Sequence, residues 1–402
     1  MSRIIIVGAG HAGGRLVQNL LSSGCESEIY LFGEEDYLPY ERPPLSKSFL
    51  SGKKQIEDLY LLPSLKFNNQ KLKLFLNNKI QKIDLEKNQI VDSHAGVYSF
   101  DKLIFANGSS PRKINFNEIK GVYYLRNIND SLNIKSKIAV SQNIVLLGAG
   151  FINLEIASTI RQNFPDKKIS IVEFSSEILG RNSNSDIRKI IYNFHLDNNI
   201  KFYFNSSIKN IIGNMRIEKI TLDTDEKFLC DMLVVGIGVK PNIDLLVNTT
   251  LFNENGIEVN QYCETNISNI FAIGDISLFN SNFFGKNVRE ESWNNAERQS
   301  FIVAQNLTGN KIKYNEIPWF WTDQFENNFQ ILGEINNYDK SIERIYDENK
   351  IIKFFIQNNK IRGAFAINNG RDIKIVKKII ANNLDIELSQ IENLNINMKK
   401  MI

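Results

Sequence analysis

Short hydrophobic runs interrupted by a glycine loop open the chain. Residues 3–7 form a β-branched run, residues 15–23 have the spacing of an amphipathic helix, and residues 27–32 form a second hydrophobic run. The glycine loop, residues 8–14, joins the first run to the helix. This order predicts a βαβ unit at the N-terminus.

The same pattern recurs in the middle of the chain. A hydrophobic run over residues 143–147 leads into Gly148-Ala149-Gly150. The residues that follow have helical spacing over 151–164 and strand character over 168–173. We therefore expect one nucleotide-binding βαβ unit to be present twice.

The rest of the pattern mixes strands and helices, so the predicted fold class is α/β. Residues 71–83 and 89–91 alternate short polar and apolar segments and are interpreted as antiparallel ribbons. Glycine and proline over residues 237–241 mark a change of chain direction. Further strands are expected at 102–106, 232–236, 270–273, 330–333, 351–356 and 361–366, and further helices at 293–307 and 372–382.

Composition limits the classes of protein that fit this pattern. The 402 residues suggest two to three domains, and 43% hydrophobic with 23% charged residues is typical of a globular protein. A net charge of +3 is too small to favour nucleic acid as the main partner. The N-terminal hydrophobic run is too short for a signal peptide, and no later apolar run reaches about 18 residues, so we expect a cytoplasmic protein.

Cysteines and histidines give no sign of a metal site. The three cysteines are far apart and form no CxxC pair, so the sequence predicts neither a disulfide framework nor a zinc site. The three histidines share no ligand spacing, and no metal is proposed. These residues are Cys25, Cys230, Cys263, His11, His94 and His195.

The first glycine loop has the G-x-G-x-x-G pattern of a dinucleotide site. Gly8 allows the tight turn, Gly10 lets the backbone approach a pyrophosphate, and Gly13 lets the helix pack on the strand. Glu34 is expected to bind the ribose hydroxyls, with the adjacent Glu35 left as the alternative. His11, inside the loop, is interpreted as a spacer.

The second loop departs from this pattern at one position. Asn153 stands where the third glycine is expected, and its side chain should push helix and strand slightly apart. Glu173, at the end of the next strand, would bind ribose hydroxyls and repel a phosphate on the same ribose, which favours NADH over NADPH. Two dinucleotide sites in one chain suggest one flavin and one nicotinamide.

Longer motifs carry a resemblance to a known family. The chain resembles the FAD-dependent, NADH-linked ferredoxin reductases of oxygenase systems, from the N-terminus to about residue 390. The similarity implies a glutathione-reductase-like fold, with two Rossmann-type dinucleotide-binding domains and a C-terminal α+β interface domain. It rests on the segments 39–47 (PYERPPLSK), 150–152 with Glu155, 271–275 (FAIGD), 291–293 (ESW) and 318–324 (PWFWTDQ).

The resemblance also implies domain boundaries, cofactors and partners. The FAD-binding domain would comprise residues 1–110 and 242–317, the NAD-binding domain residues 111–241, and the C-terminal domain residues 318–402. The implied cofactors are FAD and NADH, and the implied acceptor is a two-iron two-sulfur ferredoxin that supplies an oxygenase. Neither nucleic acid nor a membrane is an expected partner, and the oligomeric state is left open.

Site residues are carried over from the motifs that match. Arg42 and Lys47 are expected beside the flavin, and Trp321 against its ring system. Asp275 is expected at the ribityl or phosphate region of the flavin, and Glu291 near the nicotinamide. The other residues expected to bind NAD are Gly148, Gly150, Ile152, Glu155, Glu173 and Gly238.

General chemistry supports a catalytic lysine and glutamate pair. A reduced flavin is anionic at neutral pH, and an ammonium group held near the ring favours that form. Burying Lys47 alone would be costly, so Glu155 would neutralise the cation and fix its position. The loop around Lys47 contains no cysteine, so a dithiol relay is not expected. Trp319 and Trp321 alternate in an extended segment, and we expect them to face opposite sides.

Two alternatives stay open from the sequence. The first is a reductase whose acceptor is a rubredoxin or a small quinone. The second is a redox-sensing NADH-binding protein similar to apoptosis-inducing factor, which has the same Pro-Pro-Leu-Ser-Lys segment, here residues 43–47. The acceptor of the electrons separates these possibilities.

Overall fold

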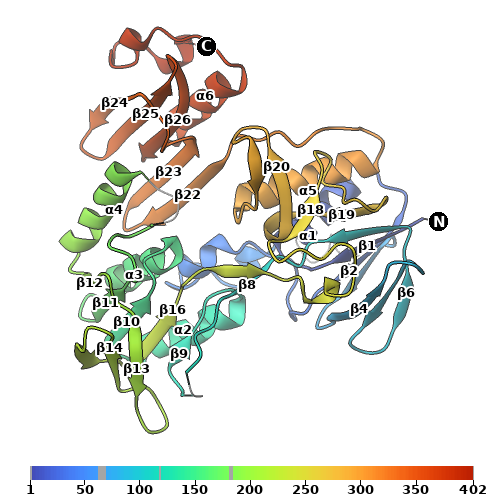
Figure 1. Cartoon of the computed structure of the whole chain (residues 1–402), viewed down its shortest axis with the longest axis horizontal. Coiled ribbons are helices and arrows are strands. Elements are labelled where there is room, and N and C mark those ends of the chain that lie inside the picture. The colour runs from blue at the N-terminus through green and yellow to red at the C-terminus, as the bar shows by residue number, and fades with distance from the viewer. Residues whose placement is uncertain (1, 62–68, 117–118, 181–183, 402) are drawn as a thin grey trace. The chain divides into compact units, whose positions relative to one another are not determined.

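The computed structural model describes residues 2–61, 69–116, 119–180 and 184–401 of the chain (Figure 1). The chain divides into two compact units. The three-domain division expected from the sequence stays a prediction. Unit 1 comprises Met1–Pro43, Ile56–Ser110 and Val239–Pro318, and unit 2 comprises Pro44–Gln55, Pro111–Gly238 and Trp319–Ile402.

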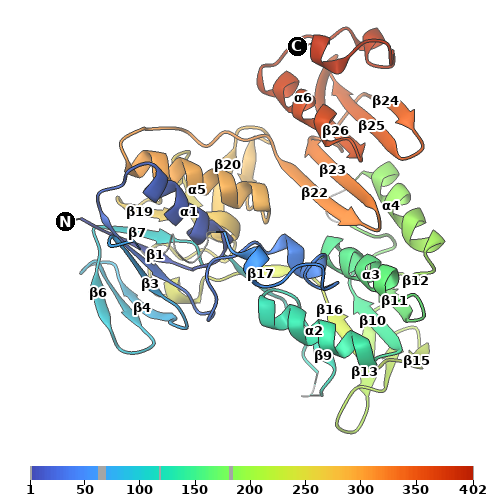
Figure 2. The same ribbon diagram turned by 180° about the vertical axis from the view of Figure 1, so that it is seen from behind.

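A five-stranded parallel sheet forms the centre of unit 1. Its strand order is β19-β7-β1-β2-β3, and every neighbouring pair runs parallel. Helices α1 (His11–Ser22) and α5 (Trp293–Leu307) pack against each other (Figure 2). The strands are β1 (Arg3–Val7), β2 (Glu28–Phe32), β3 (Leu72–Phe75), β7 (Lys102–Phe105) and β19 (Ile270–Ala272).

One strand of unit 1 contradicts the sequence prediction. The segment around Leu72 was expected in an antiparallel ribbon, but β3 pairs in parallel with β2, where Leu72 lies opposite Ile29. The reason is burial, because Leu72 belongs to the same hydrophobic cluster as Ile29 and Leu31. The antiparallel ribbon consists of β4 (Ile80–Asp84), β5 (Gln89–Asp92) and β6 (Val97–Ser99). A separate sheet contains β18 (Ile257–Val259), β20 (Ser277–Ser281) and β21 (Lys286–Val288), in which β18 runs parallel to β20 and β21 runs antiparallel to β20.

Unit 2 contains a second parallel sheet with strand order β12-β11-β10-β16-β9. The second βαβ unit is therefore confirmed, because β10 and β11 are parallel neighbours joined through α3. The strands are β9 (Val122–Tyr123), β10 (Asn143–Leu147), β11 (Lys168–Val172), β12 (Lys201–Tyr203) and β16 (Met232–Val235), and the helices are α2 (Ile128–Val140), α3 (Phe151–Asn163) and α4 (Ser185–Asp197). A small antiparallel sheet adds β13 (Ile208–Ile212), β14 (Lys219–Leu222) and β15 (Lys227–Leu229).

The C-terminal part of unit 2 is a five-stranded antiparallel sheet with a helix against it (Figure 1). Its strand order is β22-β23-β26-β25-β24. The elements are β22 (Trp319–Gln324), β23 (Asn327–Gly333), β24 (Lys340–Asp347), β25 (Lys350–Gln357), β26 (Lys360–Ile367) and α6 (Gly370–Ala381). The described residues also contain two short strands, β8 (Ser109–Pro111) and β17 (Val239–Pro241). Their 3-10 turns lie at Pro43–Ser46, Glu57–Leu59, Asp244–Leu246, Gly274–Ile276, Leu388–Gln390 and Met398–Met401.

Strand β22 presents different residues on its two faces. On one face, Phe320 packs on Phe151 of α3 with ring centroids 4.5 Å apart, and the Thr322 hydroxyl donates to Glu155 of the same helix. On the other face, the Trp319 and Trp321 rings stack with centroids 5.2 Å apart. The expectation that the two tryptophans face opposite sides is therefore wrong, because residues two apart in a strand share a face.

Among the helices of the described residues, none is both long and apolar enough to cross a bilayer.

The buried histidine of α4 predicts a pH-dependent stability. Burial lowers the pKa of His195 from 6.5 to about 4, although a hydrogen bond to Gln324 opposes the shift. Between these two values the unfolded chain binds more protons than the folded chain, so stability rises with pH across this window. We expect acidification from pH 7 to pH 4 to lower the free energy of unfolding by about 3 kcal/mol through this residue.

Chemical denaturation at several pH values measures this effect. The variant His195→Gln should lose this share of the pH dependence, whereas His94→Gln, at an exposed turn position, should keep it. An unchanged slope of stability against pH in His195→Gln would contradict the prediction.

Candidate active site

The first glycine loop leaves the start of α1 without a side-chain cap. Gly10 is the N-cap residue, so no side chain accepts a hydrogen bond from the free N–H groups of the first turn. Helices α2, α4 and α5 differ, because the side chains of Asn127, Asn184 and Ser292 cap them. The start of α1 therefore retains the donors and the positive dipole end that bind a phosphate.

Arg42 supplies a cation beside this loop. Its guanidinium lies so close to Gly10 that a Cβ atom there would be 3.4 Å from Nη2. The same group donates to the Glu35 carboxylate at 2.8 Å and to the Tyr40 hydroxyl at 3.1 Å. Burial alone would lower the pKa of Arg42, but Tyr40, Glu35 and Asp275 hold it above its ordinary value. Arg42 is thus a fixed positive charge at the place where a pyrophosphate would lie.

Asp275 belongs to the same end of the sheet. It lies in the turn Gly274–Ile276 that follows β19, and the Ser109 hydroxyl donates to its Oδ2 atom at 2.7 Å. Gly274 has a φ of +74°, and a Cβ atom at this position would lie 3.1 Å from Ala12 of α1. This close approach brings Asp275 to the loop that Arg42 flanks.

The strand registers of the two units show that Glu34 is not the residue equivalent to Glu173. Val7 pairs with Phe32 in unit 1 as Leu147 pairs with Val172 in unit 2. The residue equivalent to Glu173 is therefore Gly33, one position before Glu34. The Glu34 side chain is 69% exposed and forms an ion pair with Lys79 at 3.2 Å. Glu35 pairs with Arg42 at 2.8 Å. The binding of the ribose hydroxyls by Glu34 stays a prediction.

The second glycine loop resembles the first at its tight turn and at the start of its helix. Gly148 has a φ of +96°, and a Cβ atom at this position would lie 2.5 Å from the Gly236 carbonyl oxygen. Gly150 is the N-cap of α3 and, like Gly10, leaves the helix without a side-chain cap. Ile152 follows in the first turn of α3 and is 48% exposed. Gly238, with a φ of +97°, accepts a hydrogen bond from the Arg112 backbone at 2.9 Å.

Glu173 lies directly at this second loop. Its carboxylate accepts hydrogen bonds from the backbone N–H groups of Ala149, at 2.6 Å, and Ser175, at 2.8 Å. The Glu173 backbone is fixed as well, because its N–H donates to the Tyr203 carbonyl oxygen at 2.8 Å. The negative charge is therefore held against the first residue after Gly148.

Asn153 makes specific contacts at the position of the third glycine. Its buried Nδ2 atom donates to the carbonyl oxygens of Leu147, at 2.9 Å, and Gly148, at 2.8 Å. At the equivalent Gly13 of the first loop, a Cβ atom would lie only 2.0 Å from the Gly8 carbonyl oxygen. The second loop thus has room for a side chain that the first loop excludes, and the amide bonds hold the wider loop together.

A buried ion pair joins Lys47 and Glu155 inside unit 2. The Lys47 Nζ atom lies 2.9 Å from Glu155 Oε1, and the exposed fractions of the two side chains are 17% and 2%. Two hydroxyl groups complete the shell of the carboxylate, since Ser46 donates to Oε2 at 2.5 Å and Thr322 to Oε1 at 2.7 Å. Burying a carboxylate is costly unless donors of this kind surround it.

Further hydrogen bonds fix the backbone before Lys47. Thr159 of α3 donates to the Ser46 carbonyl oxygen at 2.8 Å, and Ser131 of α2 donates to the Leu45 carbonyl oxygen at 2.8 Å. The sequence analysis assigned no role to Ser46, Thr159, Ser131 or Thr322, because a hydroxyl residue carries no signal of its own. Only Ser46 in segment 39–47 and Thr322 in segment 318–324 lie within motifs that pointed to the site.

Two predicted site residues, Trp321 and Glu291, have other local contacts, and so does His11. Trp321 stacks on Trp319 on the face of β22 opposite Thr322, as described above. Glu291 forms an ion pair with Arg289 at 2.6 Å, and Arg289 also donates to the Asp275 carbonyl oxygen at 3.1 Å. His11, interpreted as a spacer, is buried, and its Nε2 atom lies 2.7 Å from Glu297 Oε1.

The cysteines are placed for packing. Cys25 and Cys263 belong to one hydrophobic cluster of unit 1, and Cys230 belongs to a cluster of unit 2. Burial raises the pKa of the Cys230 thiol to about 12 and raises the pKa of Cys263 as well. A thiolate at these two positions is therefore disfavoured at neutral pH.

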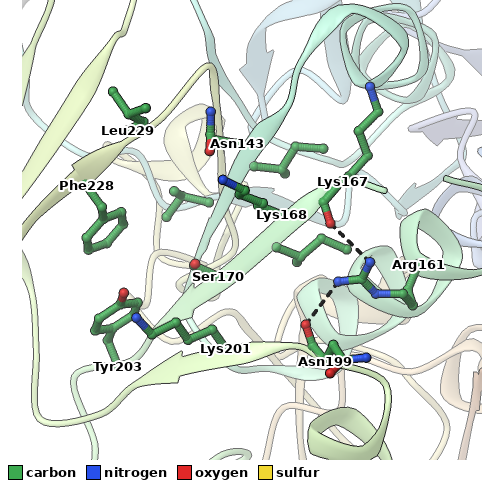
Figure 3. Close-up of a pocket in the computed structure, with 13 residues that line it drawn as sticks. Asn143, Arg161, Lys167, Lys168, Ser170, Asn199, Lys201, Tyr203, Phe228 and Leu229 are labelled. Carbon is green, nitrogen blue, oxygen red and sulfur yellow. Dashed lines mark hydrogen bonds between the residues drawn. The ribbon is translucent and has the colours of Figure 1, made fainter. Parts of the chain in front are cut away.

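Unit 2 contains a pocket of about 520 Å³ whose lining residues do not include the second glycine loop (Figure 3). It lies at the amino ends of β10 and β11, where Asn143, Lys168, Lys201 and Tyr203 contribute to its wall. Dinucleotides bind beyond the carboxyl ends of parallel strands, which is the opposite end of this sheet. The Arg161 guanidinium at its edge donates to backbone carbonyl oxygens, as the dashed lines show. We assign the pocket no part in cofactor binding.

Comparison with known proteins covers the whole length of the chain. A family model described as "Pyridine nucleotide-disulphide oxidoreductase" matches residues 2–300, and one described as "Reductase C-terminal" matches residues 319–402. Rhodocoxin reductase of Rhodococcus erythropolis is 30% identical over 403 residues, which cover 99% of this chain and 94% of that protein. The 3-phenylpropionate/cinnamic acid dioxygenase ferredoxin–NAD(+) reductase component of Photorhabdus laumondii is 29% identical over 380 residues, 94% of this chain and 96% of that protein.

Solved structures of ferredoxin reductases are also similar to this chain over its whole length. The ferredoxin reductase for the CYP199A2 system of Rhodopseudomonas palustris superposes with a TM-score of 0.93 at 29% identity, and covers 100% of this chain and 99% of that chain. Putidaredoxin reductase in its covalent complex with putidaredoxin has a TM-score of 0.93 at 25% identity, with 100% of this chain and 98% of that chain covered.

A substitution at Gly13 tests the first loop. A Cβ atom 2.0 Å from the Gly8 carbonyl oxygen forces the loop and α1 apart. We expect Gly13→Ala to cost about 1–3 kcal/mol of strain, which corresponds to a roughly 10- to 100-fold loss of FAD affinity. The ratio of flavin to protein absorbance after dialysis measures this loss. The matched control, Asn153→Ala in the second loop, should keep its FAD, and full flavin content in Gly13→Ala would contradict the assignment.

Glu173 provides a test of the second loop. Its charge should repel the 2′-phosphate of NADPH by roughly 1–4 kcal/mol. We expect Glu173→Gln to raise the ratio of kcat/KM for NADPH to that for NADH by at least about tenfold. Steady-state reduction of ferricyanide measures both values. Glu34→Gln, in the other unit, should leave the ratio unchanged, and an unchanged ratio in Glu173→Gln would exclude Glu173 from the ribose site.

Proposed function

The chain belongs to the pyridine nucleotide-disulphide oxidoreductase family, and on that premise we propose that it transfers electrons from NADH through FAD to a two-iron two-sulfur ferredoxin that supplies an oxygenase. It is an oxidoreductase and a flavoprotein that uses FAD and NAD(H). The identity of the acceptor and the roles of individual residues are part of the proposal.

The buried pair of Lys47 and Glu155 is the observation that carries the proposal. The pair places a positive charge on a short turn and holds it with a carboxylate that is 2% exposed. No cysteine lies in this turn, and the cysteines of the chain are buried elsewhere in hydrophobic clusters. The chemistry therefore favours a flavin that exchanges electrons directly with an external acceptor rather than through a protein dithiol.

Residues of unit 1 fit the adenosine and pyrophosphate portions of FAD. The uncapped start of α1 and the Arg42 guanidinium both favour a dianionic pyrophosphate. The Asp275 carboxylate can accept hydrogen bonds from the hydroxyl groups of the ribityl chain. Bound FAD supplies the ability to take up a hydride and release single electrons, which is what an iron-sulfur acceptor requires.

Residues of unit 2 fit NADH and the flavin ring. The start of α3 would bind the NADH pyrophosphate, with Gly148, Gly150, Ile152 and Gly238 lining the loop, and Glu173 would bind the ribose hydroxyls. Lys47 would stabilise negative charge on the reduced ring system, and Trp321 would pack against it. Glu291, in unit 1, is proposed to approach the nicotinamide.

The named relatives support a ferredoxin as the acceptor. One is named a ferredoxin–NAD(+) reductase component of a dioxygenase, another structure is a ferredoxin reductase, and a third contains putidaredoxin bound to its reductase. The similarity to each extends over at least 94% of this chain. These names favour a protein acceptor over a quinone.

Stopped-flow spectroscopy tests the acceptor directly. The holoenzyme is reduced with one equivalent of NADH and mixed with a two-iron two-sulfur ferredoxin of the source organism, with a rubredoxin or with a water-soluble quinone. We expect rapid reoxidation of the flavin by the ferredoxin, and slower rates at high salt because charged surfaces steer the two proteins together. Fast reoxidation by the quinone alone would overturn the proposal.

A further inference from the structure

A line of buried polar side chains leads from α4 to the carboxylate of Glu155. We propose that Thr322, Gln324 and His195 are positioning residues, which fix the orientation of the Glu155 carboxylate and thereby hold Lys47 in its working position. The inference rests on the proposed function, since it concerns how the lysine beside the flavin is fixed. It assigns a role to residues that neither the glycine motifs nor the ion pair itself explains.

The line consists of three consecutive hydrogen bonds within unit 2. His195 Nε2 lies 2.8 Å from Gln324 Oε1, Gln324 Nε2 donates to Thr322 Oγ1 at 3.1 Å, and Thr322 Oγ1 donates to Glu155 Oε1 at 2.7 Å. All four side chains are buried, with at most 2% of any residue exposed. The last acceptor in the line, Glu155 Oε1, is also the atom that contacts Lys47.

The carboxylate at one end fixes the direction of every bond. An ionised Glu155 can only accept, so the single proton of the Thr322 hydroxyl must point toward it. Thr322 must then accept from the NH₂ group of Gln324, and this turns the Gln324 oxygen toward His195. His195 therefore carries its proton on Nε2. Its Nδ1 atom has no hydrogen-bond partner among the described residues, which agrees with a neutral ring.

Aligned donors of this kind reinforce one another. In a buried site, each bond polarises the next, so the Thr322 hydroxyl is a stronger donor to Glu155 within the line than it would be alone. Because the same Oε1 atom lies 2.9 Å from the Lys47 ammonium, a donor that fixes this oxygen also fixes the position of the lysine. The line thus acts on the lysine without touching it.

Local geometry explains why these residues meet. Thr322 and Gln324 are two apart on β22 and share a face, and Glu155 and Ser158 lie on the facing side of α3. The backbone N–H of Phe325 donates to the Ser158 hydroxyl just beyond the strand, which holds the end of β22 against α3. His195 completes the line near the end of α4, where it contacts the Phe202 and Phe325 rings.

A matched pair of variants at Thr322 tests the proposal. Thr322→Val keeps the shape and removes the donor, and Thr322→Ser keeps the donor. We expect Thr322→Val to slow flavin reduction at saturating NADH by at least about tenfold, the factor expected for loss of one hydrogen bond to a charged group. The midpoint potential of bound FAD should fall, and the Kd for NADH should stay within about twofold of wild type. Thr322→Ser should resemble wild type in all three measurements.

Two results at Thr322 would overturn the proposal. The first is a wild-type reduction rate and potential in Thr322→Val. The second is equal loss in Thr322→Val and Thr322→Ser, which would assign the effect to packing. None of these measurements uses a ferredoxin, so failure of the ferredoxin assignment and failure of this inference are distinguishable.

The tautomer of His195 gives a readout that needs neither turnover nor a Thr322 variant. The chain has three histidines, and nitrogen-15 NMR of histidine-labelled holoenzyme resolves their ring forms. We expect wild-type His195 to be neutral with its proton on Nε2 at pH 7, and Gln324→Met to lose this single tautomer. A proton on Nδ1, or a charged ring, in the wild-type protein would reverse the line and overturn the proposal even if Thr322→Val fails to fold.

Discussion

The buried contact between Lys47 and Glu155 is the interaction on which the rest of unit 2 depends. Unit 2 consists of three segments that are far apart in the sequence, and the Glu155 carboxylate, which lies in the second, contacts the other two. Ser46 and Lys47 come from the first segment, Glu155 from the second, and Thr322 from the third. A buried carboxylate is tolerated only where several donors surround it. The hydrogen bonds and the ion pair that surround Glu155 therefore also hold these segments together at the candidate site.

The glycine loops of the two dinucleotide-binding units differ at two equivalent positions. In unit 1 the contact between Gly13 and Gly8 leaves no room for a side chain, whereas in unit 2 Asn153 fills the equivalent position and donates to the loop carbonyl oxygens. The strand-end position also differs, with Gly33 in one unit and Glu173 in the other. These differences give the loops different electrostatics, a cationic one beside Arg42 and an anionic one beside Glu173, although both helices begin without a side-chain cap.

Sequence reasoning predicted local structure better than packing. The strands and helices around both glycine loops were found because their hydrophobic period and glycines are local signals, and only helix α1 begins earlier than expected, at His11. The parallel pairing of β3 was not predicted, because burial of Leu72 decides this pairing. The shared face of Trp319 and Trp321 was not predicted either, although residues two apart in a strand point to the same side. The partners of Glu155 were largely missed, because Thr322 lies 167 residues away and a hydroxyl carries no motif.

Glu155 is proposed to act through Lys47, and a double-mutant cycle on the midpoint potential of bound FAD tests this coupling most directly. The four proteins are the wild type, Lys47→Met, Glu155→Gln and the double variant. Without the lysine, Glu155 has no cation to hold in place, so replacing it should change nothing further. We expect Glu155→Gln to shift the potential in the wild type but not in the Lys47→Met background. Equal shifts in both backgrounds would show that Glu155 does not act through Lys47.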